Sequence, residues 1–490
     1  MMEPRRIKYL YYLVAILILL QSCTHDPALP GLTDSGYPQN VGTIILTKCA
    51  ISGCHNNLSY INSADLNLST WDGLFNGSSL TGSIVIPYRP DFSSLCYFTN
   101  VDSSLGVISL PTMPIGKAPL TRDEYIILRD WIANGAPNTK GAIKFADNPS
   151  RTKFYITNRQ CNVITVIDAQ SQLQMRYVNV GNGTDARYPI NVQVAPDRKY
   201  WYVSFFTSTG IVQKYSADND ELTGELNLGS GTWASFVITS DSKYGYFADN
   251  EIPGRIEYVD LQNNTVLATY TFGGNFKYLT SIILNEQQKK LYVGTANGNF
   301  IYNIDITNPL SPTIREMAID GTNTIHYQSS LDPIQLLADI NSNTCYIACQ
   351  ASNEIRVFDM THDSLTCIIP LEESPAFISY SNVAHKLFVS CPDDITTFSG
   401  NRGSVSVIDT KTNTAIKKIN SGYQPYGMAD DDRDNIIAVV NSNISGPGSH
   451  HASGCGTKNG NVSFIDINTL TLIPNKQLIM AVFPYSIGYR

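Results

Sequence analysis

The sequence lacks the short motifs that mark the commonest nucleotide-binding and hydrolytic sites. No nucleophile elbow, P-loop or dinucleotide-binding fingerprint occurs in its 490 residues. The chain also has no excess of basic residues, since 34 Lys and Arg stand against 42 Asp and Glu and give a formal net charge of −8. A nucleic-acid partner is therefore disfavoured, because such partners are bound through a basic surface.

No apolar run in the sequence is long enough to be an ordinary membrane span. The nearest approach is the run 10–20, which is too short. A basic start with Arg5, Arg6 and Lys8 precedes it, as is typical of a secretory signal peptide. The pattern predicts that residues 1–22 are removed and that the protein is exported.

The end of this segment suggests how the exported protein is held. Residues 20–23, LQSC, resemble the lipobox of bacterial lipoproteins. In that family the cysteine, here Cys23, is acylated and becomes the mature N-terminus, so the resemblance implies a membrane-anchored lipoprotein with a tether over 23–37. Thr24 is not the aspartate that retains some lipoproteins at the inner membrane, which favours the outer membrane. The alternative is a short uncleaved anchor, which would also export the protein.

Histidine and methionine are scarce in the next segment, residues 38–140. His55 is its one histidine and Met113 its one methionine. His55 directly follows the second cysteine of CAISGCH, in which four residues separate Cys49 from Cys54. Met113 lies in LPTMPIGKAPL, where prolines flank it on both sides and stiffen the loop.

CAISGCH resembles the haem-attachment motif of c-type cytochromes, in the expanded form found in some bacterial members of that family. The resemblance implies one haem c bound covalently through Cys49 and Cys54, with His55 as an axial ligand of the iron. The Met113 loop resembles the distal-ligand loop of small cytochromes c, which implies Met113 as the second axial ligand. The alternative is a Cys49–Cys54 disulfide beside an incidental histidine.

A helix is predicted after the methionine loop. Thr121-x-x-Glu124 forms a capping-box pattern, Leu128 and Trp131 recur at helical spacing, and Gly135 can end the helix. A final helix that packs an aromatic residue near the haem edge is what the cytochrome c resemblance implies. Residues 38–140 are therefore expected to form a small all-α, cytochrome c-like domain.

From residue 144 onward, short strands rich in Tyr, Val, Ile and Phe alternate with Asn, Asp and Gly turns. One strand pattern recurs seven times, from FYITN at 154 to IIAVV at 436, and a second pattern such as VID at 166 follows it. The interval of about forty to fifty residues is the period of a propeller blade. We therefore predict an all-β, seven-bladed propeller over 144–490, with two open β-sandwiches as the alternative.

The C-terminal PYSIGYR is similar to the first strands of two other units, PINVQVA at 189 and PYGMADD at 425. Because the first unit lacks such a strand on its N-terminal side, the C-terminus is predicted to supply it and close the ring. The repeats resemble YVTN-type β-propellers, on stretches such as FYITNRQCNVITVID. This resemblance implies a fold and no particular function.

One loop of the seventh unit is longer and richer in glycine than its equivalents. Residues 441–460 hold His450, His451 and Cys455, whose side chains suit copper or zinc. The favoured interpretation is nevertheless an exposed loop without metal, because adjacent histidines on an extended backbone point to opposite sides. The remaining cysteines are scattered and are predicted to be mostly small buried residues: Cys96, Cys161, Cys345, Cys349, Cys367 and Cys391.

The sequence therefore predicts a multidomain, exported, lipid-anchored c-type cytochrome that transfers electrons. The propeller would bind a redox partner protein or a small-molecule ligand on one face. One alternative is a redox enzyme with a second metal or cofactor site on the propeller face, although 144–490 contains no second covalent haem motif. Another is a surface-binding lipoprotein without a redox role.

Overall fold

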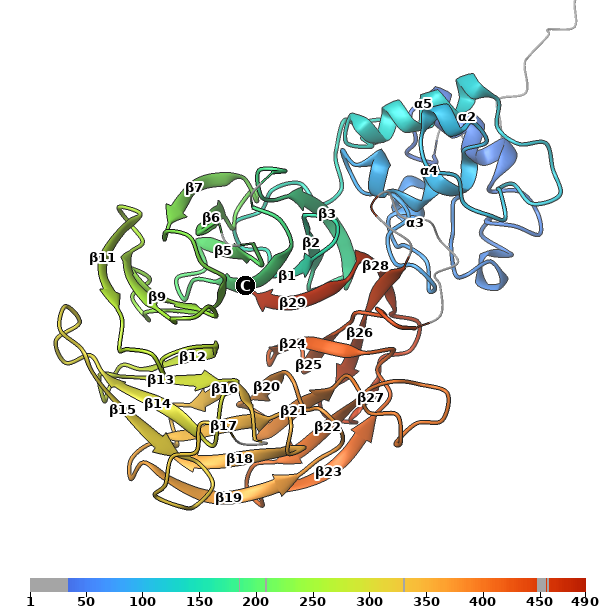
Figure 1. Cartoon of the computed structure of the whole chain (residues 1–490). Helices are drawn as coiled ribbons and strands as arrows, with labels where there is room; N and C mark the ends of the chain where they lie inside the picture. The colour runs from blue at the N-terminus through green and yellow to red at the C-terminus, as the bar shows by residue number, and fades with distance from the viewer. Residues whose placement is uncertain (1–33, 185, 208, 329–330, 447–454, 456–457) are drawn as a thin grey trace, which may run out of the picture.

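The computed structural model describes residues 34–490 except 185, 208, 329–330, 447–454 and 456–457. A small helical region precedes a ring of β-sheets (Figure 1). The α-helices of the described residues are α2 (Gln39–Lys48), α3 (Trp71–Leu74), α4 (Ser94–Thr99) and α5 (Arg122–Ala133). Short 3-10 helices span Tyr60–Asn62, Pro90–Phe92 and Ser103–Leu105.

The ring consists of seven antiparallel sheets, numbered here as blades one to seven. Blade one contains β29 (Pro484–Tyr489), β1 (Lys153–Asn158), β2 (Val163–Asp168) and β3 (Leu173–Asn179). Blade two contains β4 (Pro189–Val194), β5 (Tyr200–Phe205), β6 (Ile211–Ser216) and β7 (Leu222–Asn227). Blade three contains β8 (Trp233–Ile238), β9 (Tyr244–Asp249), β10 (Ile256–Asp260) and β11 (Thr265–Tyr270). Blade four contains β12 (Leu279–Asn285), β13 (Lys290–Thr295), β14 (Phe300–Asp305) and β15 (Thr313–Ala318).

The remaining three blades follow the same plan. Blade five contains β16 (Pro333–Asp339), β17 (Thr344–Cys349), β18 (Glu354–Asp359) and β19 (Ser364–Pro370). Blade six contains β20 (Ile378–Ser381), β21 (Lys386–Cys391), β22 (Ser404–Asp409) and β23 (Thr414–Ile419). Blade seven contains β24 (Pro425–Asp431), β25 (Ile436–Asn441), β26 (Asn459–Asp466) and β27 (Thr471–Leu472), and β28 (Leu478–Val482) also pairs with β26.

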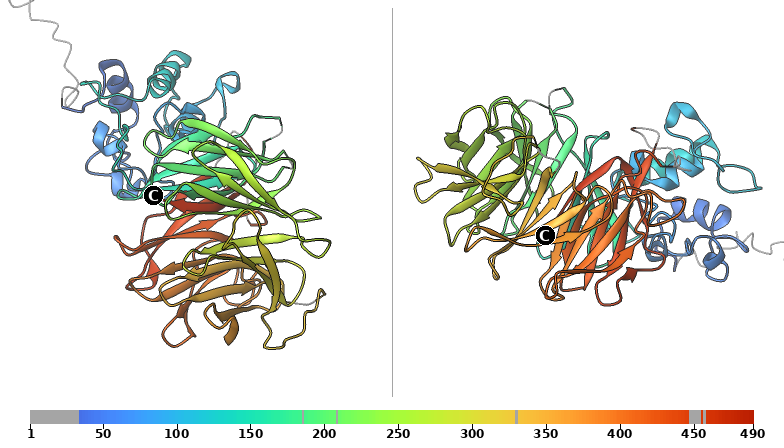
Figure 2. Two further views of the ribbon diagram at one scale, coloured as in Figure 1. Left: turned by 90° about the vertical axis from the view of Figure 1, so that its left-hand side faces the viewer. Right: turned by 60° about the horizontal axis from the view of Figure 1, so that its bottom comes forward.

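The predicted seven-bladed propeller and its closure by the C-terminus are confirmed. Strand β29 pairs antiparallel with β1, so that Tyr489 lies opposite Phe154 and Ile487 opposite Ile156. The C-terminus therefore lies beside the first strand of the ring (Figure 1). The alternative of two open β-sandwiches is wrong, because the innermost strand of each blade contacts that of the next blade all the way round the ring. The neighbouring sheets are seen from the side in Figure 2.

Position within a blade explains the recurring apolar strand pattern. The second strand of a blade is covered on both faces by neighbouring blades, and all six residues of β1 are buried. The outermost strand has a solvent face, and five of the six residues of β23 are exposed. Continuous apolar strands such as FYITN are therefore second strands, which explains why they are the clearest repeat in the sequence.

The aspartate that ends the third strand of most blades caps the hairpin that follows. The Asp260 carboxylate accepts hydrogen bonds from the N–H groups of Gln262 and Asn263, and Asp409 and Asp466 act in the same way. Four residues after each aspartate the backbone takes a positive φ, +54° at Asn264. The repeated Asp and Asn of the sequence are therefore turn residues of a common hairpin.

Helix α5 has the predicted ends. Thr121 Oγ1 accepts a hydrogen bond from the Glu124 N–H, and the Glu124 carboxylate accepts one from the Thr121 N–H, so the capping box is present. At the other end Gly135 takes a φ of +91°, and the Ala136 N–H bonds back to the Trp131 carbonyl at 2.9 Å. Lys48 at the end of α2 pairs with Glu124 at 2.6 Å, which joins the two longest helices of the described residues.

The helical region is packed against the side of the ring where it closes. Ser83 donates two hydrogen bonds to Gln174 on β3, from its N–H to Oε1 at 2.8 Å and from its hydroxyl to the carbonyl at 2.7 Å, and the Ile479 N–H on β28 bonds to the Thr81 carbonyl. Gly82 allows this approach, because a Cβ there would lie 2.3 Å from Gln174 Oε1. A single apolar cluster continues from the helices into blade one, so the two parts share a core. The chain as a whole is mostly β, with a seven-bladed propeller.

Candidate functional site

The CAISGCH segment folds into one compact loop at the end of α2. Cys49 is the C-terminal cap of this helix, and its N–H bonds to the Ile45 carbonyl. The His55 N–H bonds to the Cys49 carbonyl at 3.3 Å, which closes the loop. Cys49 is buried, whereas Cys54 and His55 are half-buried. The structure therefore brings the three predicted motif residues together on one loop.

The imidazole of His55 has one ring nitrogen engaged. Its Nδ1 lies 3.1 Å from the Leu66 carbonyl oxygen, and this contact requires the proton to be on Nδ1. The other nitrogen, Nε2, is then an unprotonated acceptor. Burial lowers the pKa of His55 below its usual value, which favours the neutral ring. A neutral histidine whose Nδ1–H is held by a carbonyl is the usual form of a metal-ligating histidine.

Both motif cysteines are free thiols. No disulfide joins Cys49 to Cys54, so the alternative with a local disulfide does not describe this structure. Burial, followed by the neighbouring Cys54, raises the pKa of Cys49 to about 12. The Cys54 carbonyl accepts hydrogen bonds from the hydroxyls of Ser59 and Ser63, at 2.9 and 3.0 Å. These bonds fix the backbone directly beside His55.

Met113 lies in a second loop of the same helical region. Its N–H bonds to the Phe98 carbonyl on α4 at 2.7 Å, which anchors the loop to a helix. The residue is half-buried. The two predicted axial ligands, His55 and Met113, therefore come from separate loops, each tied to the helical framework by backbone hydrogen bonds.

Large apolar side chains are exposed in the loops that carry these two residues. Leu58 is 93% exposed and Ile61 is 65% exposed, shortly after His55. Leu110 is 73% exposed and Ile115 is 61% exposed, on either side of Met113. Single exposed apolar residues are ordinary, but each of the two loops exposes two of them close in sequence to a predicted iron ligand.

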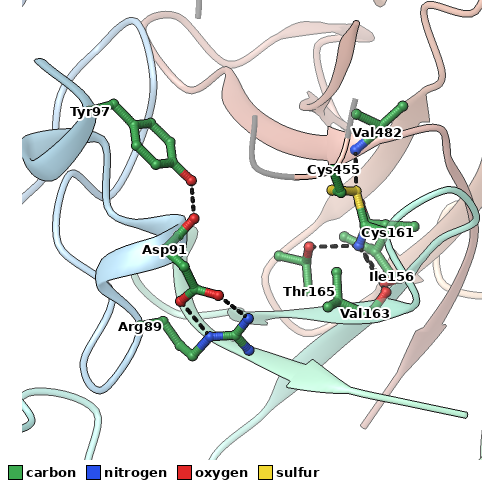
Figure 3. Close-up of a disulfide and its surroundings, with 10 residues drawn as sticks. Arg89, Asp91, Tyr97, Ile156, Cys161, Val163, Thr165, Cys455 and Val482 are labelled. Atoms are coloured by element: carbon green, nitrogen blue, oxygen red, sulfur yellow. Dashed lines mark hydrogen bonds and ion pairs between the residues drawn. A yellow bond between two sulfur atoms is a disulfide. The ribbon is translucent and has the colours of Figure 1, made fainter. Parts of the chain in front are cut away.

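The long loop of blade seven, residues 441–460, contains Cys455, one of the three residues considered as metal ligands. Cys455 forms a disulfide with Cys161, across a sequence separation of 294 residues (Figure 3). Its sulfur is therefore not a thiolate, and the suggested metal site of His450, His451 and Cys455 is wrong with respect to Cys455. His450 and His451 lie outside the described residues. No cluster of three or more His, Cys, Asp or Glu suited to a metal is present in the part of the chain that the structure describes.

The disulfide also corrects the expectation that Cys161 is simply a small buried residue. Cys161 lies in the loop between the second and third strands of blade one, and Cys455 in the equivalent loop of blade seven. These blades are neighbours only because the ring is closed. The equivalent loop positions were a usable signal in the sequence, once combined with ring closure. The bond packs beside Ile86 of the helical region and Tyr177 of β3.

The ring encloses a central cavity of about 750 Å³, lined by the innermost strands of all seven blades. Arg159, in the same loop as Cys161, is the one charged residue among the described residues of its wall. Nothing in the sequence around Arg159 marks it as a cavity residue, because the cavity is built from seven distant segments.

The N-terminal segment contains the predicted signal peptide, the predicted lipidation site and the expected tether over 23–37. Cys23 and the other residues before 34 lie outside the described residues. From residue 34 onward, apart from the gaps, no helix is long and apolar enough to cross a membrane. Ser35 and Tyr37, from the end of the expected tether, are buried in the fold, and the Tyr37 hydroxyl bonds to the Thr70 carbonyl at 2.9 Å.

Comparisons with known proteins give structural likenesses only. No protein-family model and no curated protein matches the chain. Among solved structures, the chain is similar to a hydrazine synthase of Kuenenia stuttgartiensis, with a TM-score of 0.47, 16% identity, and 61% of this chain and 89% of that chain covered. It is also similar to a functionally unknown protein from Desulfotomaculum acetoxidans, with a TM-score of 0.49, 12% identity, and 67% and 99% covered. Likenesses at this level carry no argument about function.

Proposed function

We propose that this protein is an exported, lipid-anchored c-type cytochrome that transfers single electrons. Residues 38–140 would carry one haem c, and the propeller would serve as a platform for a redox partner or a small ligand. The observation that carries the proposal is the CAISGCH loop, where two free thiols lie beside a histidine whose Nδ1 bonds to the Leu66 carbonyl. This leaves Nε2 free to bind a metal.

The residues present fit haem c. When bound, the haem would supply a ferric–ferrous couple for one-electron transfer. Cys49 and Cys54 would hold it by thioether bonds, with His55 and Met113 as axial ligands. The Leu66 carbonyl orients the His55 ring and raises its basicity as a ligand. A methionine ligand raises the potential relative to a second histidine.

The exposed apolar side chains of the two loops support the same proposal. Leu58, Ile61, Leu110 and Ile115 lie in the two ligand-bearing loops and are more than half exposed. Covering such side chains with a haem face would remove them from water, which is favourable by about 25 cal/mol per Å² of apolar surface.

The experiment that tests haem attachment compares cysteine variants made in a host with haem c maturation. The parent protein should show a haem c spectrum in the reduced-minus-oxidised difference and should retain haem after acid–acetone extraction. The Cys49→Ala, Cys54→Ala double variant should release all of its haem. Cys96→Ala is the matched control, because Cys96 is also a buried free thiol of the helical region. Covalent haem that survives in the double variant contradicts the proposal.

Export and lipid anchoring are proposed from the match of residues 20–23 to the lipobox and the apolar run before it. The Cys161–Cys455 disulfide supports export, because disulfides persist in oxidising compartments. The outer membrane is favoured because Thr24 follows Cys23. Cys23→Ala should release the protein from the membrane fraction or leave it unprocessed. An unchanged membrane fraction with the parental mature mass would exclude lipidation at Cys23.

One alternative has an observation in its favour. The central cavity favours a binding lipoprotein without a redox role, since it has the size of a small-molecule site. The absorption spectrum separates the two, because a protein that carries no haem after maturation cannot be the proposed cytochrome. The alternative of an enzyme with a metal at His450, His451 and Cys455 is weakened by the Cys161–Cys455 disulfide.

A further inference from the structure

The central cavity has the size of a ligand site. Its volume of about 750 Å³ lies within the range of small-molecule pockets, roughly 300–1,000 Å³. Its wall presents polar and apolar surface in about equal shares, with side-chain amides such as Asn191 and Gln335 beside aromatic and aliphatic side chains. Such a mixed wall can bury the apolar body of a ligand and orient its polar groups.

The charge of the wall is unbalanced. Arg159 is its single charged residue among the described positions, and none of the described lining residues is Asp or Glu. This contrasts with the chain as a whole, which carries eight more acidic than basic residues. An arginine remains charged at neutral pH in a protein, even though burial lowers the pKa of Arg159. The cavity therefore presents one positive charge and no carboxylate.

Aromatic rings hold this guanidinium in place. Its central carbon lies 4.7 Å from the ring centre of Phe206, 4.8 Å from that of Phe483 and 4.9 Å from that of Tyr485. Phe206 follows β5, whereas Phe483 and Tyr485 lie at the junction of β28 and β29. Ring contacts leave the N–H donors at the edge of the guanidinium available. Arg159 is partly exposed, so a ligand can reach it.

Further aromatic residues continue from Tyr485 along the wall of the cavity. The rings of Tyr426 and Tyr485 are 5.1 Å apart, and Phe377 packs edge-on against Tyr485 at 5.3 Å. All three line the cavity. A planar ring could stack on this wall while an attached anion meets Arg159. Aromatic stacking contributes about 0.5–1.5 kcal/mol beyond area burial.

The backbone positions of this site are restrained by covalent and hydrogen bonds. The Arg159 N–H bonds to the Phe483 carbonyl at 2.9 Å. Two residues later, Cys161 is linked to Cys455, and its Sγ accepts a hydrogen bond from the Val482 N–H at 3.1 Å (Figure 3). The loop that carries Arg159 is thus tied to blade seven next to the aromatic residues. A restrained site loses less conformational entropy when a ligand binds.

We infer that the central cavity binds a small organic carboxylate with an aromatic body, whose carboxylate pairs with Arg159. The planar guanidinium matches a carboxylate in a two-point contact. The rings of Tyr426, Tyr485 and Phe377 receive the aromatic body. This site extends the proposed role of the propeller and does not depend on haem, so its test and the haem spectrum are read separately on the same protein.

The inference is tested by isothermal titration calorimetry, in which the full-length protein is titrated separately with benzoate, benzamide and inorganic phosphate. Benzoate has both the anion and the ring, whereas benzamide lacks the charge and phosphate lacks the ring. Saturable binding of benzoate is expected, with the two others at least about tenfold weaker. Benzamide loses a hydrogen bond between charged groups, worth about 1.5–3 kcal/mol. Phosphate loses the stacking of the ring, worth about 0.5–1.5 kcal/mol, together with the burial of its apolar surface. Equal binding of benzamide, equal binding of phosphate, or no benzoate binding at millimolar concentration overturns the inference.

Two arginine variants locate the site. Arg159→Gln should weaken benzoate binding at least about tenfold and leave the weak benzamide binding unchanged. Arg187→Gln is the matched control, because Arg187 is exposed, lies over the single ring of Tyr188 at 5.8 Å, and does not line the cavity. Parental benzoate affinity in Arg159→Gln, or an equal loss in Arg187→Gln, overturns the inference. If Arg159→Gln fails to fold, the three-ligand comparison on the parent still decides.

Discussion

The Cys161–Cys455 disulfide should stabilise the propeller by several kcal/mol. It joins loops of blades one and seven, which lie next to each other only because β29 closes the ring against β1. In the unfolded chain the same two residues are 294 positions apart. A bond across so long a stretch removes much of the conformational freedom of the unfolded chain, so it raises the free energy of unfolding.

The magnitude follows from the length of the closed loop. The chain-entropy relation gives about 6 kcal/mol at 25 °C for a loop of 294 residues. Measured values for disulfides fall below this relation, typically at about 2–4 kcal/mol, because native strain and residual structure of the unfolded chain intervene. We therefore expect a loss of about 2–5 kcal/mol on removing the bond. For a propeller of this length, with about 2.1 cal/mol/K of unfolding entropy per residue, this corresponds to a fall in Tm of about 3–7 °C.

The assay compares thermal unfolding of the parent with the Cys161→Ser, Cys455→Ser double variant, each with and without reductant. The parent should lose stability in reductant, and the double variant should start at the reduced value and not change further. Cys367→Ser is the control, because Cys367 is a free, half-buried thiol on β19. Its Tm should respond to reductant as that of the parent does.

Two results would refute this reasoning. If the double variant melts at the temperature of the oxidised parent, the bond does not restrict the unfolded chain as proposed. If reductant lowers the Tm of the double variant as much as that of the parent, another disulfide is responsible. Peptide mapping without reductant shows directly whether residues 161 and 455 are linked.

Three further predictions concern the closing strand, the proposed iron ligand Met113 and the half-buried carboxyl of Asp430. Deleting residues 484–490 removes β29 and exposes the edge of β1. Aggregation or a large loss of propeller Tm is expected, with the haem spectrum preserved. A truncated protein as stable as the parent contradicts the pairing of β29 with β1. Met113→Ala should abolish the near-infrared band of methionine ligation, make the haem partly high spin and lower its potential; a parental spectrum and potential would exclude Met113 as a ligand. Burial, followed by Asp432, raises the pKa of Asp430 from 3.8 to about 6, so the folded protein loses stability as pH rises through that interval. Asp430→Asn should therefore flatten the pH dependence of the unfolding free energy between those values, as measured by denaturant titration at several pH values. If the unfolding free energy of the variant still changes with pH as much as that of the parent, Asp430 is not the cause.

Much of the propeller could be predicted from the sequence, because its local signals repeat. Seven apolar second strands such as FYITN are buried on both faces, and an aspartate such as Asp409 caps the following turn by bonds to nearby N–H groups. Both are short-range effects that depend on residue type and spacing. The C-terminal strand was predictable for the same reason, since PYSIGYR has the pattern of other first strands. The capping box at Thr121 is equally local.

The CAISGCH loop shows where sequence-based prediction ends. The spacing of Cys49, Cys54 and His55 is visible in the sequence, and the three residues lie close together because they belong to one short loop. The hydrogen bond from His55 to the Leu66 carbonyl was not predictable, because Leu66 is placed by the packing of the whole helical region. The exposure of Leu58 and Leu110 likewise depends on which neighbours the fold provides.

The sequence alone predicted the order of the strands, their period and the closure of the ring, because each strand shows a recurring residue pattern within its own segment, including the C-terminal PYSIGYR. Only the tertiary structure decided the partner of Cys455 and the surroundings of Arg159. Cys161 and Cys455 meet because seven blades complete one circle, and the aromatic rings around Arg159 come from blades one, two and seven. Contacts of this kind depend on the geometry of the closed ring. No single segment of the sequence specifies that geometry.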